Sequence, residues 1–478
     1  MNHKNQLVKN TVIIAIGKLS TQVLSYILLP LYTAKMATGE YGTYDFICTV
    51  SRFLCPLITL LMEESMFRFL IDAKTKDDRK KIISQTIIYT LGGTLVFIPL
   101  AILVFKLSSS YTNSFIAIII FFIISNIFIG LSNALARGLS KIKLYSLSNF
   151  ILGIVTLLLT IIVLLTSHSA GGLLMANAIA NIVTAMIIFG FLGLHKYFGS
   201  YDKPLMKEMI EYSFPLVPNS ISWSIINMSD RIILTKLISS SANGIYAMAC
   251  RFPNIISVLY GYFYTAWKES AAKIIKEDNK EAYYNSIYLD MKKFIYSVTL
   301  CLIAIMPFAF PIFINKNYNA AYVYIPIIMI ATYFSNLSSF YGGIFSAYKD
   351  TKIMGITTLV AATINLVIDL AFMKKIEIFA ACFSTLIADL IVYYYRRYKL
   401  KEYIKLKEPK MFGPSIIMAF VCVTYYFKYI PKISTALYWV SSVIALTISI
   451  IYSILLNYKA LTKVKIKLKE KLHLKRES

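Results

Sequence analysis

Apolar residues in this chain come in blocks of about twenty, the length at which a helix crosses the hydrocarbon core of a bilayer. The blocks lack the strict alternation of apolar and polar positions that is typical of a half-buried strand. The pattern therefore predicts an all-α integral membrane protein with about fourteen transmembrane helices. The predicted spans are residues 8–32, 41–62, 82–105, 114–136, 144–166, 172–194, 214–238, 244–267, 294–314, 320–346, 353–373, 376–395, 411–430 and 434–457.

Composition and charge agree with a membrane protein. Of the 478 residues, 58% are hydrophobic and 15% are charged, whereas soluble proteins carry about 25% charged residues. The net charge of +25 could suggest a nucleic-acid partner, but most of the 49 Lys and Arg lie in alternate segments outside the spans, beginning with the N-terminus, and few lie in the other segments. This asymmetry follows the positive-inside rule. We therefore expect a multi-pass protein of the cytoplasmic membrane with both termini in the cytoplasm, and no nucleic-acid partner.

Two segments about 200 residues apart resemble each other. Gly42 and Tyr44 begin one span after a short external turn, and Gly244 and Tyr246 begin another in the same way. Six spans separate the two segments, so both have the same orientation, as in a parallel repeat about an axis along the membrane normal. We expect a six-helix bundle at residues 1–200, a second at 201–407, and two extra helices with a basic tail at 408–478.

Basic residues inside the predicted spans are the most informative feature of the sequence. Each costs about 2.5–3.5 kcal/mol near the centre of a membrane helix, so it must face water or find a partner. The four basic residues that lie well inside the spans, away from their ends, are Lys18, Arg52, Arg231 and Arg251.

Helical spacing places these cations on stripes with polar residues. Arg52 follows Asp45 and Thr49 on one stripe, and Arg231 follows Asn227 on another. Such stripes favour a hydrophilic interior lined by both halves of the chain. Two further roles stay open for these residues: the amides and hydroxyls can join helices by hydrogen bonds, and the arginines can pair with acids across helices. The candidate substrate contacts are Lys18, Gln22, Arg52, Asn126, Asn133, Asn181, Asn227, Arg231, Arg251 and Asn254.

Acidic residues within the spans are fewer. Asp230 and Asp369 are the candidates for coupling transport to a proton or a sodium ion. The first predicted span carries Lys18 and no acid, so we expect the chamber of the N-terminal half to be cationic and to select anions.

Sequence features of enzymes and of metal sites do not occur. The four histidines lie at the ends or in loops, the six cysteines occur singly, and no Walker loop, GxSxG or HExxH motif is present. We expect a protein that is not an enzyme and has no cofactor.

The chain resembles a known family. The run Leu28–Thr33, the run Gly39–Asp45, and Asp230-Arg231 with Gly244-Ile245-Tyr246 resemble segments of the polysaccharide repeat-unit flippases. These belong to a superfamily that also contains the multidrug and toxin extruders (MATE) and the lipid II flippase.

The resemblance implies a MATE-like, two-lobed fold of fourteen helices that alternates between inward-open and outward-open states. It implies that the substrate is an undecaprenyl-pyrophosphate-linked oligosaccharide, moved from the inner to the outer leaflet. The partners would be this lipid, the bilayer and other proteins of polysaccharide assembly. Because arginine binds phosphate oxygens bidentately, the four buried cations become candidate contacts for the pyrophosphate or for acidic sugars.

Two alternative functions stay open. A cation-coupled multidrug or metabolite antiporter of the same fold would depend on Asp230 or Asp369. A membrane enzyme of polysaccharide assembly would need a large external loop with catalytic residues, but the longest predicted external loops have only about ten residues.

Overall fold

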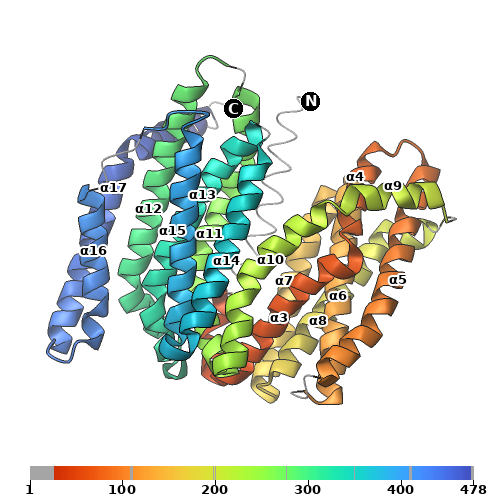
Figure 1. Cartoon of the computed structure of the whole chain (residues 1–478), viewed down its shortest axis with the longest axis horizontal. Helices are drawn as coiled ribbons and strands as arrows, with labels where there is room; N and C mark the ends of the chain where they lie inside the picture. Colours follow the sequence, from red (N-terminus) through yellow and green to blue (C-terminus); the bar gives the residue numbers. More distant parts are fainter. Residues whose placement is uncertain are drawn as a thin grey trace. The chain divides into compact units, whose positions relative to one another are not determined.

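The computed structural model describes residues 26–107, 111–197, 199, 201–275, 277–348, 350–407 and 412–474, and within this part of the chain every regular element is a helix (Figure 1). The prediction of an all-α protein is confirmed. Contacts divide the chain into two compact units, Met1–Gly244 (unit 1) and Ile245–Ser478 (unit 2).

Unit 1 is built around α6 and α8, which pack closely on each other. Its core is aliphatic, with Ile119 and Ile123 of α6 and Leu174 of α8 fully buried. The elements of unit 1 are α2 (Leu29–Lys35), α3 (Thr38–Thr59), α4 (Met62–Asp72), α5 (Lys76–Leu107), α6 (Asn113–Gly138), α7 (Ile142–Thr166), α8 (Ala170–Leu192), η1 (Leu194–Tyr197), α9 (Lys203–Ser213), α10 (Leu216–Ile233), the π-helical turn η2 (Leu234–Ile238) and the first turn of α11 (Ser240–Ile274).

Unit 2 is built around α15, which packs on both α13 and α14, while α12 packs on α17. Aromatic rings fill much of its core: Trp267 stacks on Phe340 with centroids 4.2 Å apart, and Tyr322 stacks on Tyr425 at 4.1 Å. Besides the rest of α11, the elements of unit 2 are α12 (Lys280–Phe313), η3 (Lys316–Tyr324), α13 (Ile325–Ala347), α14 (Thr351–Ile376), α15 (Ile378–Leu400), α16 (Phe412–Tyr426), η4 (Phe427–Tyr429) and α17 (Thr435–Leu474).

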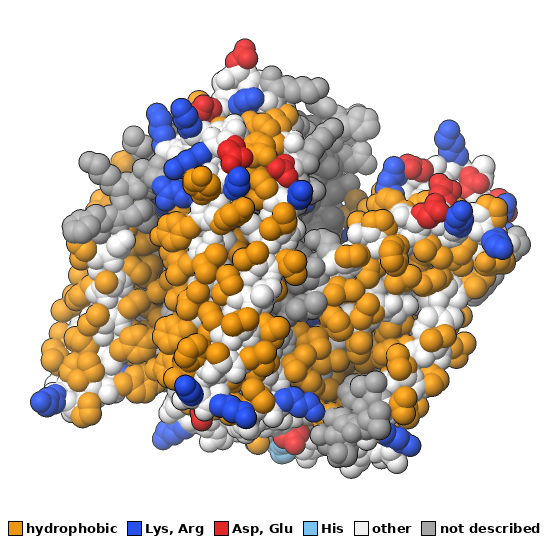
Figure 2. Space-filling view, viewed as in Figure 1, with side chains coloured by type: hydrophobic (Ala, Val, Ile, Leu, Met, Phe, Trp, Pro, Cys, Tyr) orange, Lys and Arg blue, Asp and Glu red, His pale blue; other side chains and the backbone are white. Residues whose placement is uncertain are grey.

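The helices have the length and composition of membrane spans. Nine helices of the described residues are long and apolar enough to cross a bilayer, and the pair α3 and α4, bent by 55°, makes a tenth if it is one broken span. Figure 2 shows hydrophobic side chains over the middle of the helices and charged side chains near their ends. Thirteen of the fourteen predicted spans coincide with helices; most of the first, 8–32, lies outside the described residues.

Several helices are longer than the apolar blocks predicted. α12 begins at Lys280 rather than near residue 294, and α5 begins at Lys76 rather than near residue 82. Lysine and glutamate are good helix formers, so these helices continue past the apolar segment. α3, in contrast, ends at Thr59 because Leu60 and Leu61 both adopt positive φ.

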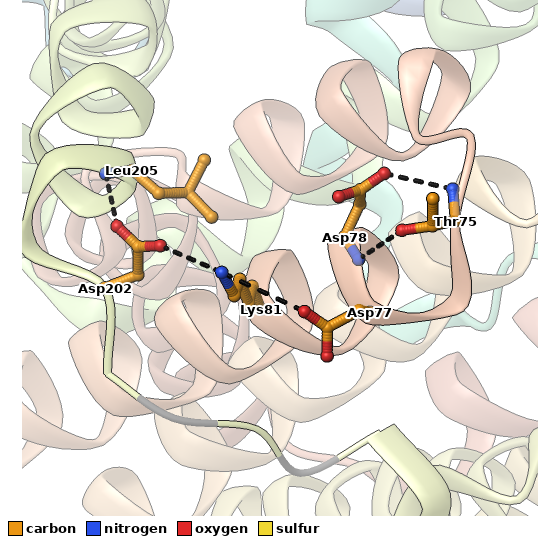
Figure 3. A network of polar contacts seen from close by, with 6 residues as sticks. All are labelled: Thr75, Asp77, Asp78, Lys81, Asp202 and Leu205. Atoms are coloured by element: carbon orange, nitrogen blue, oxygen red, sulfur yellow. Dashed lines mark hydrogen bonds and ion pairs between the residues drawn. The ribbon is translucent and has the colours of Figure 1, made fainter.

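A polar network attaches α9 to unit 1 (Figure 3). Asp202 caps α9 by accepting a hydrogen bond from the Leu205 amide at 3.1 Å, and the Lys81 ammonium lies 3.5 Å from the second oxygen of Asp202 and 3.9 Å from Asp77. The segment before α9 is held as well, because Ser84 donates to the Tyr197 carbonyl at 3.2 Å. Helix α9, which follows the predicted boundary at residue 200, thus packs on unit 1. The bounds 1–200, 201–407 and 408–478 stay a prediction.

Candidate functional site

Unit 1 contains a cavity of about 1430 Å³ with mainly apolar walls. Phe46, Val50 and Phe53 of α3 line one side, and Val96 and Leu100 of α5 line the other. Val96 of α5 is 74% exposed, so the cavity is open to the surroundings of the protein on the side of this helix. The cavity exceeds the roughly 300–1,000 Å³ of ordinary small-molecule sites, and an apolar surface of this size suits hydrocarbon.

The cavity follows the length of α3. Its lining on this helix runs from Thr43 to Ile58, which is about 22 Å of helix and most of the roughly 30 Å hydrocarbon core. Lys236 of η2 and Ser240 of α11 line the end near Thr43, while α9 lines the other end with Met206. A long chain could therefore lie along α3 with a polar group at either end.

Two glycines of α5 shape the floor of this cavity. A Cβ on Gly93 would collide with the Ile58 carbonyl, so α5 approaches the α3 backbone there. A Cβ on Gly92 would meet nothing within 4 Å, and Gly92 lines the cavity. One glycine therefore brings the two helices together, and its neighbour leaves open space.

The polar stripe of α3 consists of Asp45, Thr49 and Arg52. Each of these residues directly precedes a residue of the apolar lining, so the stripe lies beside the lining on the helix surface. Near its start the Arg231 Nε of α10 donates to Asp45 Oδ2 at 2.6 Å, and the two side chains are only 18% and 16% exposed. Of the roles that the sequence leaves open to Arg231, pairing across helices is therefore observed. A ligand contact by Arg231 stays a prediction.

Arg52 lies two turns further along the same stripe and differs from Arg231. Its side chain is exposed, and it has no hydrogen bond or ion pair with any residue that the structure describes. A guanidinium at this depth in a membrane helix needs water or an anion. Arg52 is thus the predicted contact that the structure leaves most available to a ligand.

The predicted asparagines of unit 1 join helices. Asn181 Nδ2 of α8 donates to Ser125 Oγ at 3.1 Å and to Asn126 Oδ1 at 3.4 Å, and Asn126 Nδ2 reaches Ser51 Oγ of α3 at 3.4 Å. Asn133 accepts a hydrogen bond from a serine of α7 at 2.9 Å. Their observed role is to hold helices together, and their contact with a sugar stays a prediction.

The remaining predicted contacts lie elsewhere. Lys18 and Gln22 lie outside the described residues, and the side chain of Asn227 is not described. Arg251 and Asn254 lie three residues apart on the part of α11 that belongs to unit 2, the first half-buried and the second exposed.

The two candidate coupling acids are buried. Asp230 of α10 is 4% exposed, and Asp369 of α14 is fully buried. Asp369 follows Asn365 by one helical turn, and Asn365 Nδ2 donates to Ser384 Oγ of α15 at 3.0 Å. Asp369 therefore belongs to a polar seam between α14 and α15, and an ion-coupling role for either acid stays a prediction.

Two buried cations of unit 2 are absent from the residues predicted from the sequence. Arg396 is 4% exposed and donates to Thr357 Oγ1 at 2.9 Å, to the Ser338 carbonyl at 3.2 Å, and to the Met354 carbonyl and Thr358 Oγ1 at 3.3 Å. Lys292 is equally buried. Both fall in predicted loops because the apolar blocks end before the helices do. The signal that could have found Arg396 is the unbroken helical pattern through the three tyrosines that precede it.

No group of three His, Cys, Asp or Glu within the described ranges could hold a metal ion. The arrangement instead combines a long apolar cavity with a polar stripe that carries one exposed cation and one ion pair, a combination suited to binding an amphiphile with an anionic head.

Comparison with known proteins gives one family and a fold. Residues 7–267 match the model of a family described as polysaccharide biosynthesis protein. No curated protein matches the chain by sequence.

Solved structures share the fold over most of the chain. The lipid II flippase MurJ in an inward closed conformation has a TM-score of 0.72 at 14% identity, with 94% of this chain and 100% of that chain covered. An inward-facing multidrug resistance transporter of the MATE family has a TM-score of 0.66 at 13% identity, covering 81% and 98%. A transporter of the same superfamily from Pyrococcus furiosus, described as having a binding pocket of reversed polarity, has a TM-score of 0.54 at 12% identity, covering 82% and 96%. The predicted MATE-like fold is confirmed, and these structures are of a flippase and transporters, not of enzymes.

Proposed function

This chain belongs to the polysaccharide biosynthesis protein family, and we propose that it is a flippase that moves lipid-linked oligosaccharides from the inner to the outer leaflet of the cytoplasmic membrane. The substrate would be a polyprenyl pyrophosphate that carries a sugar repeat unit. The chain would move this lipid by alternating access, and both of its termini would lie in the cytoplasm.

The observation that carries this proposal is the cavity along α3. Its apolar lining extends over about 22 Å of helix, so it suits an extended hydrocarbon chain rather than a compact drug. The polar stripe of the same helix places the exposed Arg52 next to this lining. An amphiphile could thus bind with its chain against the apolar side of α3 and its phosphates against the polar side.

The charges of the stripe favour an anionic head. A pyrophosphate would bind Arg52 through two parallel hydrogen bonds, the geometry in which a guanidinium holds phosphate oxygens. Arg231 is already neutralised by Asp45, so it would add little net charge unless the pair opens. We propose Asp230 and Asp369 as the residues that couple transport to a proton or a sodium ion.

Deletion of the gene tests the function directly. We expect surface polysaccharide to be lost and lipid-linked repeat units to accumulate in the inner leaflet, where an impermeant glycosidase cannot reach them. Restoring the gene should reverse both effects. If polysaccharide is unchanged while sensitivity to cationic drugs rises, the chain is instead an antiporter.

Filling the cavity should impair transport without unfolding the protein. Gly92→Leu places an aliphatic side chain in open space, so we expect normal protein levels and at least about a tenfold loss of transport of long-chain substrates, comparable to about 1.4 kcal/mol of lost binding. Gly355→Leu on α14 is the matched control, because a Cβ there also meets nothing within 4 Å. Equal transport by the two variants would mean that the substrate chain does not occupy this cavity.

A further inference from the structure

The first turns of α3 and α11 cross in direct backbone contact. A Cβ on Gly42 would collide with the Ser240 carbonyl, and a Cβ on Gly244 would collide with the Thr38 carbonyl, each far closer than the 3.0 Å that real Cβ atoms keep. Small residues are what allow membrane helices to approach this closely. The crossing therefore requires glycine on both helices.

The contact is reciprocal. Each glycine meets the carbonyl of the residue four positions before the other glycine, so the two helices contribute the same surface. Asn243 is fully buried beside the crossing, and its Nδ2 donates to the Gly42 carbonyl at 2.8 Å. The repeated pattern of glycine followed two residues later by tyrosine thus marks the two sides of one contact.

The crossing lies where α11 leaves unit 1. Unit 1 ends at Gly244, and α11 continues from Ile245 as part of unit 2. The π-helical turn η2 and the extended Ser239 come just before α11. The first turn of α11 is therefore held on α3 by the crossing and is separated from α10 by irregular backbone.

We propose that this crossing is a latch, closed in the conformation described here, which must part when the adjoining ends of α3 and α11 separate during transport. Its observed contacts are the two close glycine approaches and the Asn243 hydrogen bond. Separating a local contact of this kind has a modest cost, because one hydrogen bond contributes only about 0.5–1.5 kcal/mol net. The inference rests on the proposed transport function, since only a transport cycle requires the ends to separate.

A methyl group at either glycine tests the latch. Gly42→Ala and Gly244→Ala should hold the two helices apart and so favour the open state. The probe is a cysteine at Ala242, which is 7% exposed in the first turn of α11, and the measurement is its labelling in whole cells by a membrane-impermeant maleimide. We expect labelling at least about tenfold faster than in the parent, because a minor open state of a few per cent becomes the major one.

Controls separate the latch from misfolding and from the natural cysteines. Gly190→Ala adds the same methyl where nothing lies within 4 Å, so its labelling should match the parent, and the chain without the Ala242 cysteine gives the background. Asn243→Ala removes the hydrogen bond to Gly42 without adding a methyl group to either glycine, and it should speed labelling by a smaller factor. The Asn243→Ala variant tests the latch proposal if the glycine variants do not reach the membrane.

The outcomes distinguish the latch from the transport function. Labelling needs no substrate. Faster labelling of the glycine variants, in cells whose polysaccharide does not depend on the chain, would therefore support the latch proposal and contradict the flippase proposal. Labelling at the control rate in the glycine and Asn243 variants would overturn the latch and leave the flippase standing.

Discussion

Replacing Arg52 with alanine should abolish surface polysaccharide while the protein stays at its normal level in the membrane. Arg52 is exposed and has no polar partner within the described part of the chain, so its removal leaves no other group unsatisfied. Its loss should nevertheless remove the charge that holds the phosphates. Truncation of a charged hydrogen-bonding partner typically costs about 2–5 kcal/mol of binding, which is roughly thirtyfold or more in affinity.

Complementation of a deletion strain measures this effect, with membrane protein quantified in parallel. Arg52→Lys should keep part of the activity, because an ammonium keeps the charge and loses the bidentate fork. Arg68→Ala is a matched control, since Arg68 is an exposed arginine of unit 1 that pairs with Asp72, four residues away on the same helix. Normal polysaccharide in both Arg52→Ala and Arg52→Glu cells would remove Arg52 from the binding site.

Breaking the pair of Asp45 and Arg231 should instead reduce the amount of folded protein. The two side chains are 16% and 18% exposed and lie 2.6 Å apart, so removing either leaves a largely buried charge without its partner. Such changes cost about 3–5 kcal/mol. We therefore expect Asp45→Ala and Arg231→Ala to lower both the thermal midpoint in detergent and the level in the membrane.

A double-mutant cycle isolates the pair. The double alanine variant leaves neither charge behind, so it should be more stable than either single variant, and the exchange Asp45→Arg with Arg231→Asp should recover part of the loss. Fluorescence-detected unfolding of the four proteins gives the coupling energy. Additive effects of the two alanine substitutions would mean that the observed contact contributes nothing to stability.

The sequence predicted the helices better than their ends. Apolar blocks identify the part of a helix that crosses hydrocarbon, and they do not report where the backbone stops being helical. α12 therefore begins fourteen residues before its predicted span, at Lys280. The break after Thr59 was not predictable either, because two leucines at positive φ carry no composition signal.

The stripes placed polar residues on common helix faces and could not assign their partners. Helical periodicity placed Asp45 and Arg52 on one face of α3, but whether either meets Arg231 depends on how α10 crosses α3. The cavity was not predictable for the same reason, since it depends on the approach of α5 to α3 at Gly93. Packing between helices that are distant in sequence determines both the partner of Arg231 and the shape of the cavity.

The hydrogen-bond partners of Arg396 constrain how the protein is assembled in the membrane. Its guanidinium is bound by oxygens of α13 and α14, and α15 alone supplies none of them. A newly inserted α15 would have to hold this side chain toward the lipid headgroups until a receptive surface exists. Because α13 and α14 are synthesised before α15, the surface that binds Arg396 can form before α15 is inserted. The order of synthesis therefore avoids exposing the guanidinium to lipid.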